Sequence, residues 1–219
     1  MRGLFITIEG PEGAGKTTQA NLLMEWLQSQ GIPTLYTREP GDGVIGAQIR
    51  QIILNPENAD LTARAEALLY AADRAQHVER VLLPALQEGK VVLCDRYVDS
   101  HMAYQGYGRG LDTEFLRELN HMATGGLMPA FTLLLRLSPE EGLERVIKHR
   151  NKDRMELQEI EFHERLVAGY DAIAEANPKR VYVVDAAQPI IEVREQIIRA
   201  MGSFLLQAGY DVNVYMPED

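Results

Sequence analysis

Five short runs of apolar residues alternate along the chain with longer segments of helical period. The runs cover residues 3–9, 33–38, 90–95, 131–137 and 180–185. In "KVVLCD" and "RVYVVD" the apolar side chains are almost uninterrupted, which is typical of strands covered on both faces. Between the runs, apolar residues recur at helical spacing, and this predicts helices at 15–30, 44–55, 61–88, 111–124, 139–150, 154–176 and 189–207. The alternation predicts an α/β fold with a five-stranded parallel sheet.

No repeat, low-complexity tract or linker rich in proline, glycine or serine interrupts this alternation. The chain has 219 residues, of which 46% are apolar, and this is enough to enclose one substantial core. We therefore expect residues 1–219 to form a single three-layer α/β/α domain. The last stretch, "DVNVYMPED", fits no element and stays unassigned.

The chain carries a net charge of −10, from 32 acidic and 22 basic residues. Because this excess repels polyanions, we expect no binding to a nucleic-acid backbone or to an anionic membrane surface. An anionic ligand must then meet a local basic pocket. The single cysteine, Cys94, excludes an internal disulfide, and the apolar run before Glu9 is too short for a signal peptide or a membrane span. These features predict a cytoplasmic protein.

A phosphate-binding motif follows the first apolar run. It is Gly10-Pro11-Glu12-Gly13-Ala14-Gly15-Lys16-Thr17, which matches G-x-x-x-x-G-K-[ST] at every fixed position and is followed by Thr18. Glycines let successive backbone N–H groups turn toward a phosphate, and the next helix adds the partial positive charge of its N-terminus. Lys16 would reach the β- and γ-phosphates, and the Thr17 hydroxyl is placed to ligate Mg²⁺. Residues 10–18 therefore predict a nucleoside triphosphate site.

Charged residues end the second and third apolar runs. Arg38 ends the second run, and Asp95 followed by Arg96 ends the third. The carboxyl ends of parallel strands form the ligand crevice of such a sheet, and a P-loop enzyme needs a Mg²⁺-organising acid there. Taken alone, Asp95 also fits a capping aspartate. Beside a P-loop, we predict that Asp95 joins Thr17 in a metal site.

An ordered set of motifs resembles the thymidylate kinase family, which transfers phosphate from ATP to thymidine monophosphate (dTMP). The motifs run nearly the full length and are "IEGPEGAGKTT", "TREPG" with a later "IR", "LLYAADRAQHVE", "DRYVDSHMAYQGYGRG", "DRMELQEIEFHERLVAGY" and "VDAAQP". The resemblance implies a P-loop NTPase fold with a small lid at about residues 148–158. It also implies ATP and dTMP as substrates, Mg²⁺ as cofactor, dTDP and ADP as products for dTTP synthesis, and a homodimer.

The resemblance assigns the acceptor site to matching residues. Arg38 and Arg96 would hold the dTMP phosphate, and two guanidinium groups suit a dianion in an acidic protein. Tyr70 would stack on thymine and Arg74 would bond a base carbonyl, and their spacing of four puts both on one helix face. An ordinary amphipathic helix is the plain alternative for this pair.

Three further residues receive roles by the same resemblance. Gln105, in the glycine-rich turn "AYQGYGRG", would bond the thymine edge, while Tyr104 would crowd the sugar's 2′ position. Glu12 would meet the 3′-hydroxyl region, although by itself it also fits a solvated loop acid.

A basic cluster holds the expected catalytic arginine. It comprises Lys148, Arg150, Lys152 and Arg154. The P-loop contains no arginine, and the resemblance then implies one in the lid: Arg154 in "DRME", with Arg150 as the rival. By itself such a run is usually a solvated surface. Over the transferred phosphoryl group, a guanidinium would neutralise charge alongside Lys16, the metal and Arg96.

One departure from the family and two rival functions remain. Asp42-Gly43 stand where the family has a glycine pair and a threonine. The Asp42 carboxylate then either faces solvent or weakens phosphate binding unless Arg38 or Arg50 offsets its charge. A deoxynucleoside or broader deoxynucleotide kinase of the same fold is the nearer rival, and the pair Arg38 and Arg96 favours an acceptor that already carries phosphate. A non-enzymatic nucleotide-binding module is the more distant rival, against which Lys16 and the metal-binding pair argue.

Overall fold

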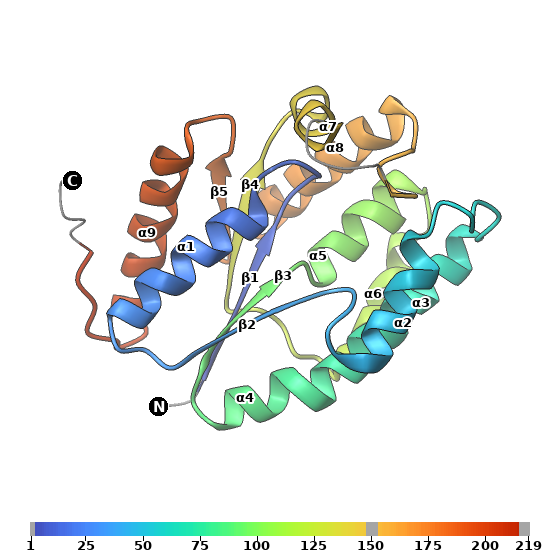
Figure 1. The fold of residues 1–219 in the computed structure, drawn as a ribbon. Helices are drawn as coiled ribbons and strands as arrows, with labels where there is room; N and C mark the ends of the chain where they lie inside the picture. Colours follow the sequence, from blue (N-terminus) through green and yellow to red (C-terminus); the bar gives the residue numbers. More distant parts are fainter. Residues whose placement is uncertain (1–2, 148–152, 215–219) are drawn as a thin grey trace.

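A computed structural model describes residues 3–147 and 153–214 (Figure 1). A five-stranded sheet forms its centre, with the strands in the order β2-β3-β1-β4-β5. All neighbouring strands pair in parallel. The strands are β1 (Leu4–Glu9), β2 (Thr34–Arg38), β3 (Val91–Asp95), β4 (Phe131–Arg136) and β5 (Val181–Asp185). The predicted five-stranded parallel sheet is confirmed.

Helices cover both faces of the sheet (Figure 1). Two of them are segments of π-helix, here η1 and η2, that continue neighbouring α-helices. The helices are α1 (Lys16–Ser29), α2 (Gly43–Leu54), α3 (Ala63–His77), η1 (Val78–Leu82), α4 (Leu83–Gln87), α5 (Val98–His101), η2 (Met102–Gly108), α6 (Thr113–Thr124), α7 (Pro139–Ile147), α8 (Ile160–Ala176) and α9 (Ile190–Gln207).

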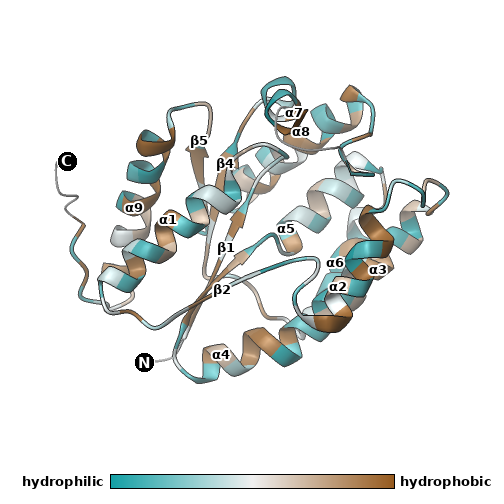
Figure 2. Ribbon diagram, in the orientation of Figure 1, coloured by the Kyte–Doolittle hydropathy of each residue, from teal (hydrophilic) through white to brown (hydrophobic). Residues whose placement is uncertain are grey.

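Alternate residues of β1 serve two separate cores. Ile6 and Ile8 point to one face, where they belong to a cluster with Leu27 of α1 and with α9. Phe5 points to the other face and packs in a cluster with Leu82 of η1. Both faces of the central strand are therefore buried, which explains why its sequence is apolar throughout rather than alternating. The hydropathy colouring shows the same brown centre between largely teal outer helix faces (Figure 2).

Two expectations about local structure are wrong. The segment "AYQGYGRG" is not a turn, because residues 102–108 form η2 as the continuation of α5. The helix expected at 154–176 begins only at Ile160, since Asp153 organises the preceding residues into turns. Its Oδ1 accepts hydrogen bonds from the backbone N–H groups of Met155 at 2.9 Å and Glu156 at 3.1 Å.

The first part of the C-terminal tail packs against α1 and α9. Val212 is buried, and the backbone N–H of Asn213 donates to Gln30 Oε1 at 2.7 Å. A side chain at Gly202 of α9 would stand 2.8 Å from Val214 Cγ1, so this glycine admits the tail. Across residues 3–147 and 153–214, no helix combines the length and the apolar character that a membrane crossing needs.

Candidate active site

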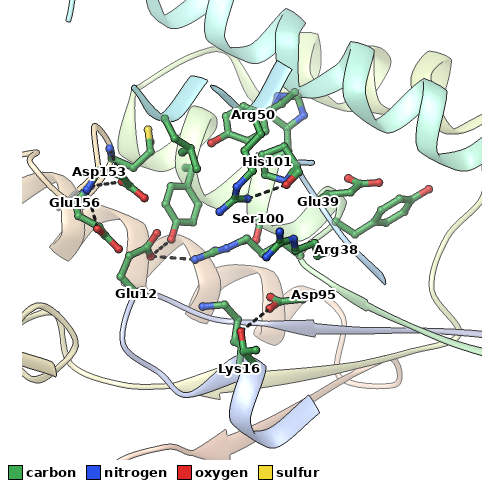
Figure 3. Close-up of a pocket in the computed structure, with 18 of the residues that line it drawn as sticks. Glu12, Lys16, Arg38, Glu39, Arg50, Asp95, Ser100, His101, Asp153 and Glu156 are labelled. Carbon is green, nitrogen blue, oxygen red and sulfur yellow. Dashed lines mark hydrogen bonds and ion pairs between the residues drawn. The ribbon is translucent and has the colours of Figure 1, made fainter. Parts of the chain in front are cut away.

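One cavity of about 270 Å³ lies at the carboxyl ends of β1, β2 and β3 (Figure 3). This is the edge at which parallel α/β sheets bind their ligands. It brings together most of the residues singled out from the sequence, namely Glu12, Gly13, Gly15, Lys16, Thr17, Thr18, Arg38, Tyr70, Arg74, Asp95, Arg96, Tyr104 and Gln105. Gly10, Pro11, Ala14 and Arg154 do not line it.

The loop between β1 and α1 has the conformation that its glycines permit. Gly13 has a φ of 70°, and a Cβ there would lie 2.2 Å from the backbone oxygen of Gly142 in α7. Gly15 has a φ of 82° and is the N-cap of α1. Both positions favour glycine because φ is positive, and Gly13 also needs it because the backbone of Gly142 approaches closely. The N-terminus of α1 is thereby presented to the cavity, where it favours an anion.

Lys16 lies at the start of α1 with its Nζ inside the loop. It donates hydrogen bonds to the backbone oxygens of Gly10 at 3.0 Å and Pro11 at 2.7 Å. Burial, together with the nearby Arg96 charge, lowers the pKa of Lys16 to about 8. The ammonium group is therefore held by loop carbonyls and is available to a phosphate that enters the loop.

Thr17 and Asp95 meet across the cavity floor, as the sequence predicts. Thr17 Oγ1 donates to Asp95 Oδ2 at 3.3 Å, and the hydroxyl of Tyr36 donates to the same oxygen at 3.3 Å. Asp95 Oδ1 is buried and has no hydrogen-bond partner among the described residues. An aspartate oxygen without a partner beside a threonine hydroxyl supplies hard oxygen ligands of the kind that Mg²⁺ prefers, so these residues fit the metal.

Arg96 projects into the cavity from an unusual backbone conformation. Its φ is 70°, the one positive value at a non-glycine residue in the described chain. The Nη1 donates to Ser100 Oγ at 3.2 Å and to the Tyr170 hydroxyl at 3.3 Å. The guanidinium also stacks over the Tyr104 ring, 4.9 Å from its centroid. Such left-handed backbone costs roughly 1–3 kcal/mol and persists where surrounding contacts fix it, often at functional sites.

Glu12 joins the P-loop to the opposite wall of the cavity. Its Oε2 lies 3.1 Å from Arg96 Nη2 and accepts a hydrogen bond from the Tyr104 hydroxyl. Figure 3 shows Glu12 directed into the cavity near Lys16. Burial acts to raise the pKa of Glu12, but the charges of Arg96 and Lys16 outweigh it, and the net pKa is lowered. Glu12 is therefore an ionised side chain within the cavity rather than a solvated loop acid.

Arg74 is buried at the far end of the cavity. Its Nε pairs with Glu39 Oε2 at 2.8 Å, and its Nη1 donates to Asn120 Oδ1 at 2.8 Å. Its Nη2 donates to the backbone oxygen of Tyr97 at 3.2 Å. These contacts hold the guanidinium rigidly, and Nη2 retains a second N–H. Tyr70, one turn earlier on α3, lines the same end, with its ring centroid 6.0 Å from that of His101.

A second arginine accompanies Arg38 at the cavity wall. Arg50 of α2 donates from Nη1 to the backbone oxygen of Pro40 at 2.7 Å and faces the cavity beside Arg38. Asp42, by contrast, does not line the cavity. Its Oδ2 accepts from the hydroxyl of Thr37 and lies 3.8 Å from Nε2 of His77. The carboxylate that departs from the family pattern thus points away from the two arginines.

The structure describes one of the two expected lid arginines. Arg150 lies outside the described residues. Arg154 is buried, pairs through Nη2 with Glu66 Oε2, and donates from Nε to the backbone oxygen of Ile53 at 2.6 Å. In this structure Arg154 therefore serves a buried ion pair, and its neighbours Asp153 and Met155 line the cavity in its place.

Sequence reasoning missed a buried acid beneath Arg96. Glu9 Oε1 accepts the backbone N–H of Tyr97 at 2.8 Å, and its Oε2 accepts the hydroxyl of Ser100. Burial, with the negative charge of Asp99, raises the pKa of Glu9 to about 7. The hydroxyl of Tyr170 lies 2.8 Å from that of Ser100. No local motif marks these residues as a group, because α8 and β1 meet only in the fold.

Comparison with known proteins gives one consistent family. The sequence matches the family model for thymidylate kinase over residues 8–197. It is 50% identical to a thymidylate kinase of Synechococcus sp. (strain JA-3-3Ab), over 94% of this chain and 98% of the relative. It is 46% identical to that of Bacillus pumilus, over 92% and 96%. The crystal structure of thymidylate kinase from Ehrlichia chaffeensis superposes with a TM-score of 0.76 at 30% identity, covering 92% of this chain and 99% of that one.

Proposed function

The chain belongs to the thymidylate kinase family, and from that premise we propose how its own residues transfer the γ-phosphoryl group of ATP to dTMP, giving dTDP and ADP. One observation supports the proposal most directly. Lys16 and Thr17 of the P-loop face the same cavity as Arg38 and Arg96. A donor phosphate on the first pair and an acceptor phosphate on the second would meet inside that cavity.

The donor end consists of the P-loop and α1. Backbone N–H groups of the loop and the N-terminus of α1 bind the β- and γ-phosphates of ATP. Lys16 exchanges its two backbone oxygen partners for phosphate oxygens. Thr17 and Asp95 would hold Mg²⁺, which, when bound, neutralises phosphate charge and orients the β- and γ-oxygens.

The acceptor phosphate of dTMP is bound by Arg38 and Arg96, with Arg50 beside them. Arg96 Nη1 donates to neighbouring protein oxygens and Nη2 pairs with Glu12, whereas Nε donates to no acceptor among the described residues. The Nε side of the guanidinium is therefore available to a phosphate. The acceptor phosphate is already ionised and needs no general base. The work of these residues is to align one of its oxygens with the γ-phosphorus and to neutralise charge as the bond to the β-phosphate oxygen breaks.

The nucleoside of dTMP occupies the far end of the cavity. Tyr70 stacks on the thymine ring, while Arg74 and Gln105 hydrogen-bond its polar edge. Tyr104 crowds the 2′ position and Glu12 meets the 3′-hydroxyl. The bond from the Tyr104 hydroxyl to Glu12 supports this pairing, since one contact fixes both groups beside the sugar.

The remaining positive charge that neutralises the transferred phosphoryl group comes from an arginine of a lid at about residues 148–158. Arg154 and Arg150 are the candidates. Arg154 could act only after leaving Glu66, with which it forms a buried ion pair. Breaking such a pair is costly, about 3–5 kcal/mol when a partner is lost, so its contacts favour a structural role and favour Arg150 as the catalytic arginine.

We also propose that the enzyme is a cytoplasmic homodimer. Three adjacent helices, α2, α3 and α6, expose large apolar side chains: Val44, Ile45, Ile52, Leu68 and Met122. Val44 is 77% and Met122 is 72% exposed, which is unusual for residues of this type and marks a contact surface. The brown patches on α2 in Figure 2 belong to this face. The buried free thiol of Cys94 is consistent with a reducing compartment.

An acceptor panel tests the function. ADP release is measured with ATP and Mg²⁺ in the presence of dTMP, dUMP, dCMP, dGMP, dAMP or thymidine. We expect a strong preference for dTMP. A preference for thymidine would indicate a deoxynucleoside kinase, and equal activity on several monophosphates would indicate a broader deoxynucleotide kinase. The absence of product with every acceptor would leave only a nucleotide-binding module.

A further inference from the structure

Glu66 is a fully buried carboxylate that does not itself line the cavity. It lies in the first turn of α3 with an exposed fraction of 0%. Its Oε1 accepts from Gln105 Nε2 at 2.9 Å and from Arg109 Nε at 3.1 Å. Its Oε2 accepts from Arg109 Nη2 at 3.1 Å and from Nη2 of Arg154. Four donors thus occupy the four acceptor positions of one carboxylate, which holds it rigidly as an acceptor on both oxygens.

This arrangement fixes which end of the Gln105 amide faces Glu66. A carboxylate flanked by two guanidinium groups only accepts hydrogen bonds, so the NH₂ group of Gln105 must be the end turned toward it. The carbonyl oxygen is then left on the other side of the amide. Gln105 lines the cavity, and its side-chain oxygen Oε1 accepts no hydrogen bond from the part of the chain that the structure describes.

We infer that Glu66 is a specificity-determining positioning residue, which orients the Gln105 amide so that an acceptor oxygen faces the pyrimidine edge of the nucleotide. The inference rests on the proposed function, in which Gln105 reads that edge. Thymine and uracil present an N3–H donor at this position, whereas cytosine presents the N3 lone pair. An oxygen held there attracts the first and repels the second.

Arg74 completes the same donor and acceptor pattern. Its contacts with Glu39, Asn120 and the backbone of Tyr97 leave one Nη2 hydrogen for the cavity. That hydrogen suits the O4 carbonyl of thymine and opposes the N4 amino group of cytosine. Arg74 and Gln105 line the same cavity, so a fixed donor and a fixed acceptor can meet one base there. Together they match the edge of thymine at two positions and mismatch the edge of cytosine at both.

The substitution Glu66→Gln should reverse the amide. Two guanidinium N–H groups, one each from Arg109 and Arg154, donate to the Oε2 position, whereas only Arg109 Nε donates to the Oε1 position. The single oxygen of the new side chain therefore belongs at the Oε2 position, where it satisfies more of these charged donors. Its NH₂ group then occupies the Oε1 position and donates toward Gln105. The Gln105 carbonyl turns to meet it, and the Gln105 NH₂ group faces the base.

The test is the ratio of kcat/KM for dTMP to kcat/KM for dCMP. We expect Glu66→Gln to lower this ratio by at least tenfold, mainly through a higher KM for dTMP, because one well-placed polar contact discriminates bases by about that factor or more. Arg109→Met is the matched control. It removes two donors from Glu66 and destabilises the same cluster, but it leaves the carboxylate as an acceptor for Gln105. Its dTMP to dCMP ratio should stay within about twofold of the wild type.

The outcomes separate this inference from the proposed function. A wild-type enzyme that prefers dTMP, together with a Glu66→Gln variant that keeps the full preference, would overturn the inference alone. An equal loss of preference in Arg109→Met would also overturn it, since general loosening of the cluster would then explain the effect. A wild-type enzyme without preference for dTMP would contradict the proposed function and the inference with it.

A measurement on the wild-type protein covers the case in which Glu66→Gln does not fold. NMR with ¹⁵N-labelled dTMP and ¹³C-labelled protein detects coupling across the hydrogen bond between the thymine imino group and the side-chain carbonyl carbon of Gln105. We expect that coupling. A base that instead accepts a hydrogen bond from the Gln105 NH₂ group would overturn the inference.

Discussion

Glu9 links the pH dependence of stability to the backbone beneath Arg96. In the folded protein its pKa is raised to about 7, first by burial and then by the charge of Asp99, from an ordinary value of 4.5. Above pH 4.5 the unfolded chain releases this proton, while the folded protein keeps it until about pH 7. The folded state thus binds more protons in that window, and Glu9 makes folding less favourable as pH rises through it.

The magnitude follows from the two pKa values. Each unit of difference corresponds to about 1.4 kcal/mol, and integration between pH 5 and pH 8 gives about 2.5 kcal/mol. Glu9→Gln removes the titration but keeps an oxygen for the backbone N–H of Tyr97. The free energy of unfolding of the variant minus that of the wild type should therefore increase by about 2.5 kcal/mol from pH 5 to pH 8.

Urea unfolding of both proteins at pH 5, 6, 7 and 8 measures this difference. Other titrating groups, such as Asp73, occur in both proteins and cancel in the comparison. Parallel stability curves, with a constant difference between variant and wild type, would refute the reasoning. A difference that shrinks with rising pH would show that the folded protein lowers the pKa of Glu9 instead.

Three further predictions concern the cavity and the apolar surface. Because burial lowers the pKa of Lys16 to about 8, its deprotonation in the free enzyme should reduce kcat/KM for ATP about tenfold between pH 7 and pH 9. A kcat/KM from initial rates that stays constant over this range would contradict the prediction. Asp42→Gly should leave KM for dTMP within about twofold of the wild-type value, since the carboxylate accepts a hydrogen bond from Thr37 outside the cavity. A tenfold lower KM in steady-state assays would show that the carboxylate repels the substrate. If the proposed homodimer forms through this surface, Ile45→Glu on α2 should convert it to a monomer in sedimentation velocity. A dimeric wild type with an unchanged sedimentation coefficient in the variant would contradict this contact surface.

The sheet and the phosphate loop could be predicted because their signals are local. Each strand is one apolar run, and the loop has fixed glycines at fixed spacing between a strand and a helix. The carboxyl-end rule for parallel strands then placed Asp95 and Thr17 together, and the structure confirms their contact at 3.3 Å.

The sequence did not predict local structure correctly where contacts between distant segments decide it. Three glycines in "AYQGYGRG" indicated a turn, yet η2 packs against α8, and a side chain at Gly108 would stand 2.6 Å from the ring of Phe162. Arg154 belongs to a basic run that reads as a lid, but its partner Glu66 lies 88 residues earlier. No local sequence pattern indicates such a pair, because the fold brings together two charges that lie far apart in the sequence.

Transfer of label from γ-³²P ATP tests the central claim most directly. In a single turnover with dTMP and Mg²⁺, the wild-type protein should move the label to dTDP. Lys16→Ala, folded by circular dichroism, should form almost none, because it lacks the lysine that we propose binds the transferred phosphoryl group. Near-normal dTDP formation by the variant, or label released from the wild type as inorganic phosphate alone, would contradict the account.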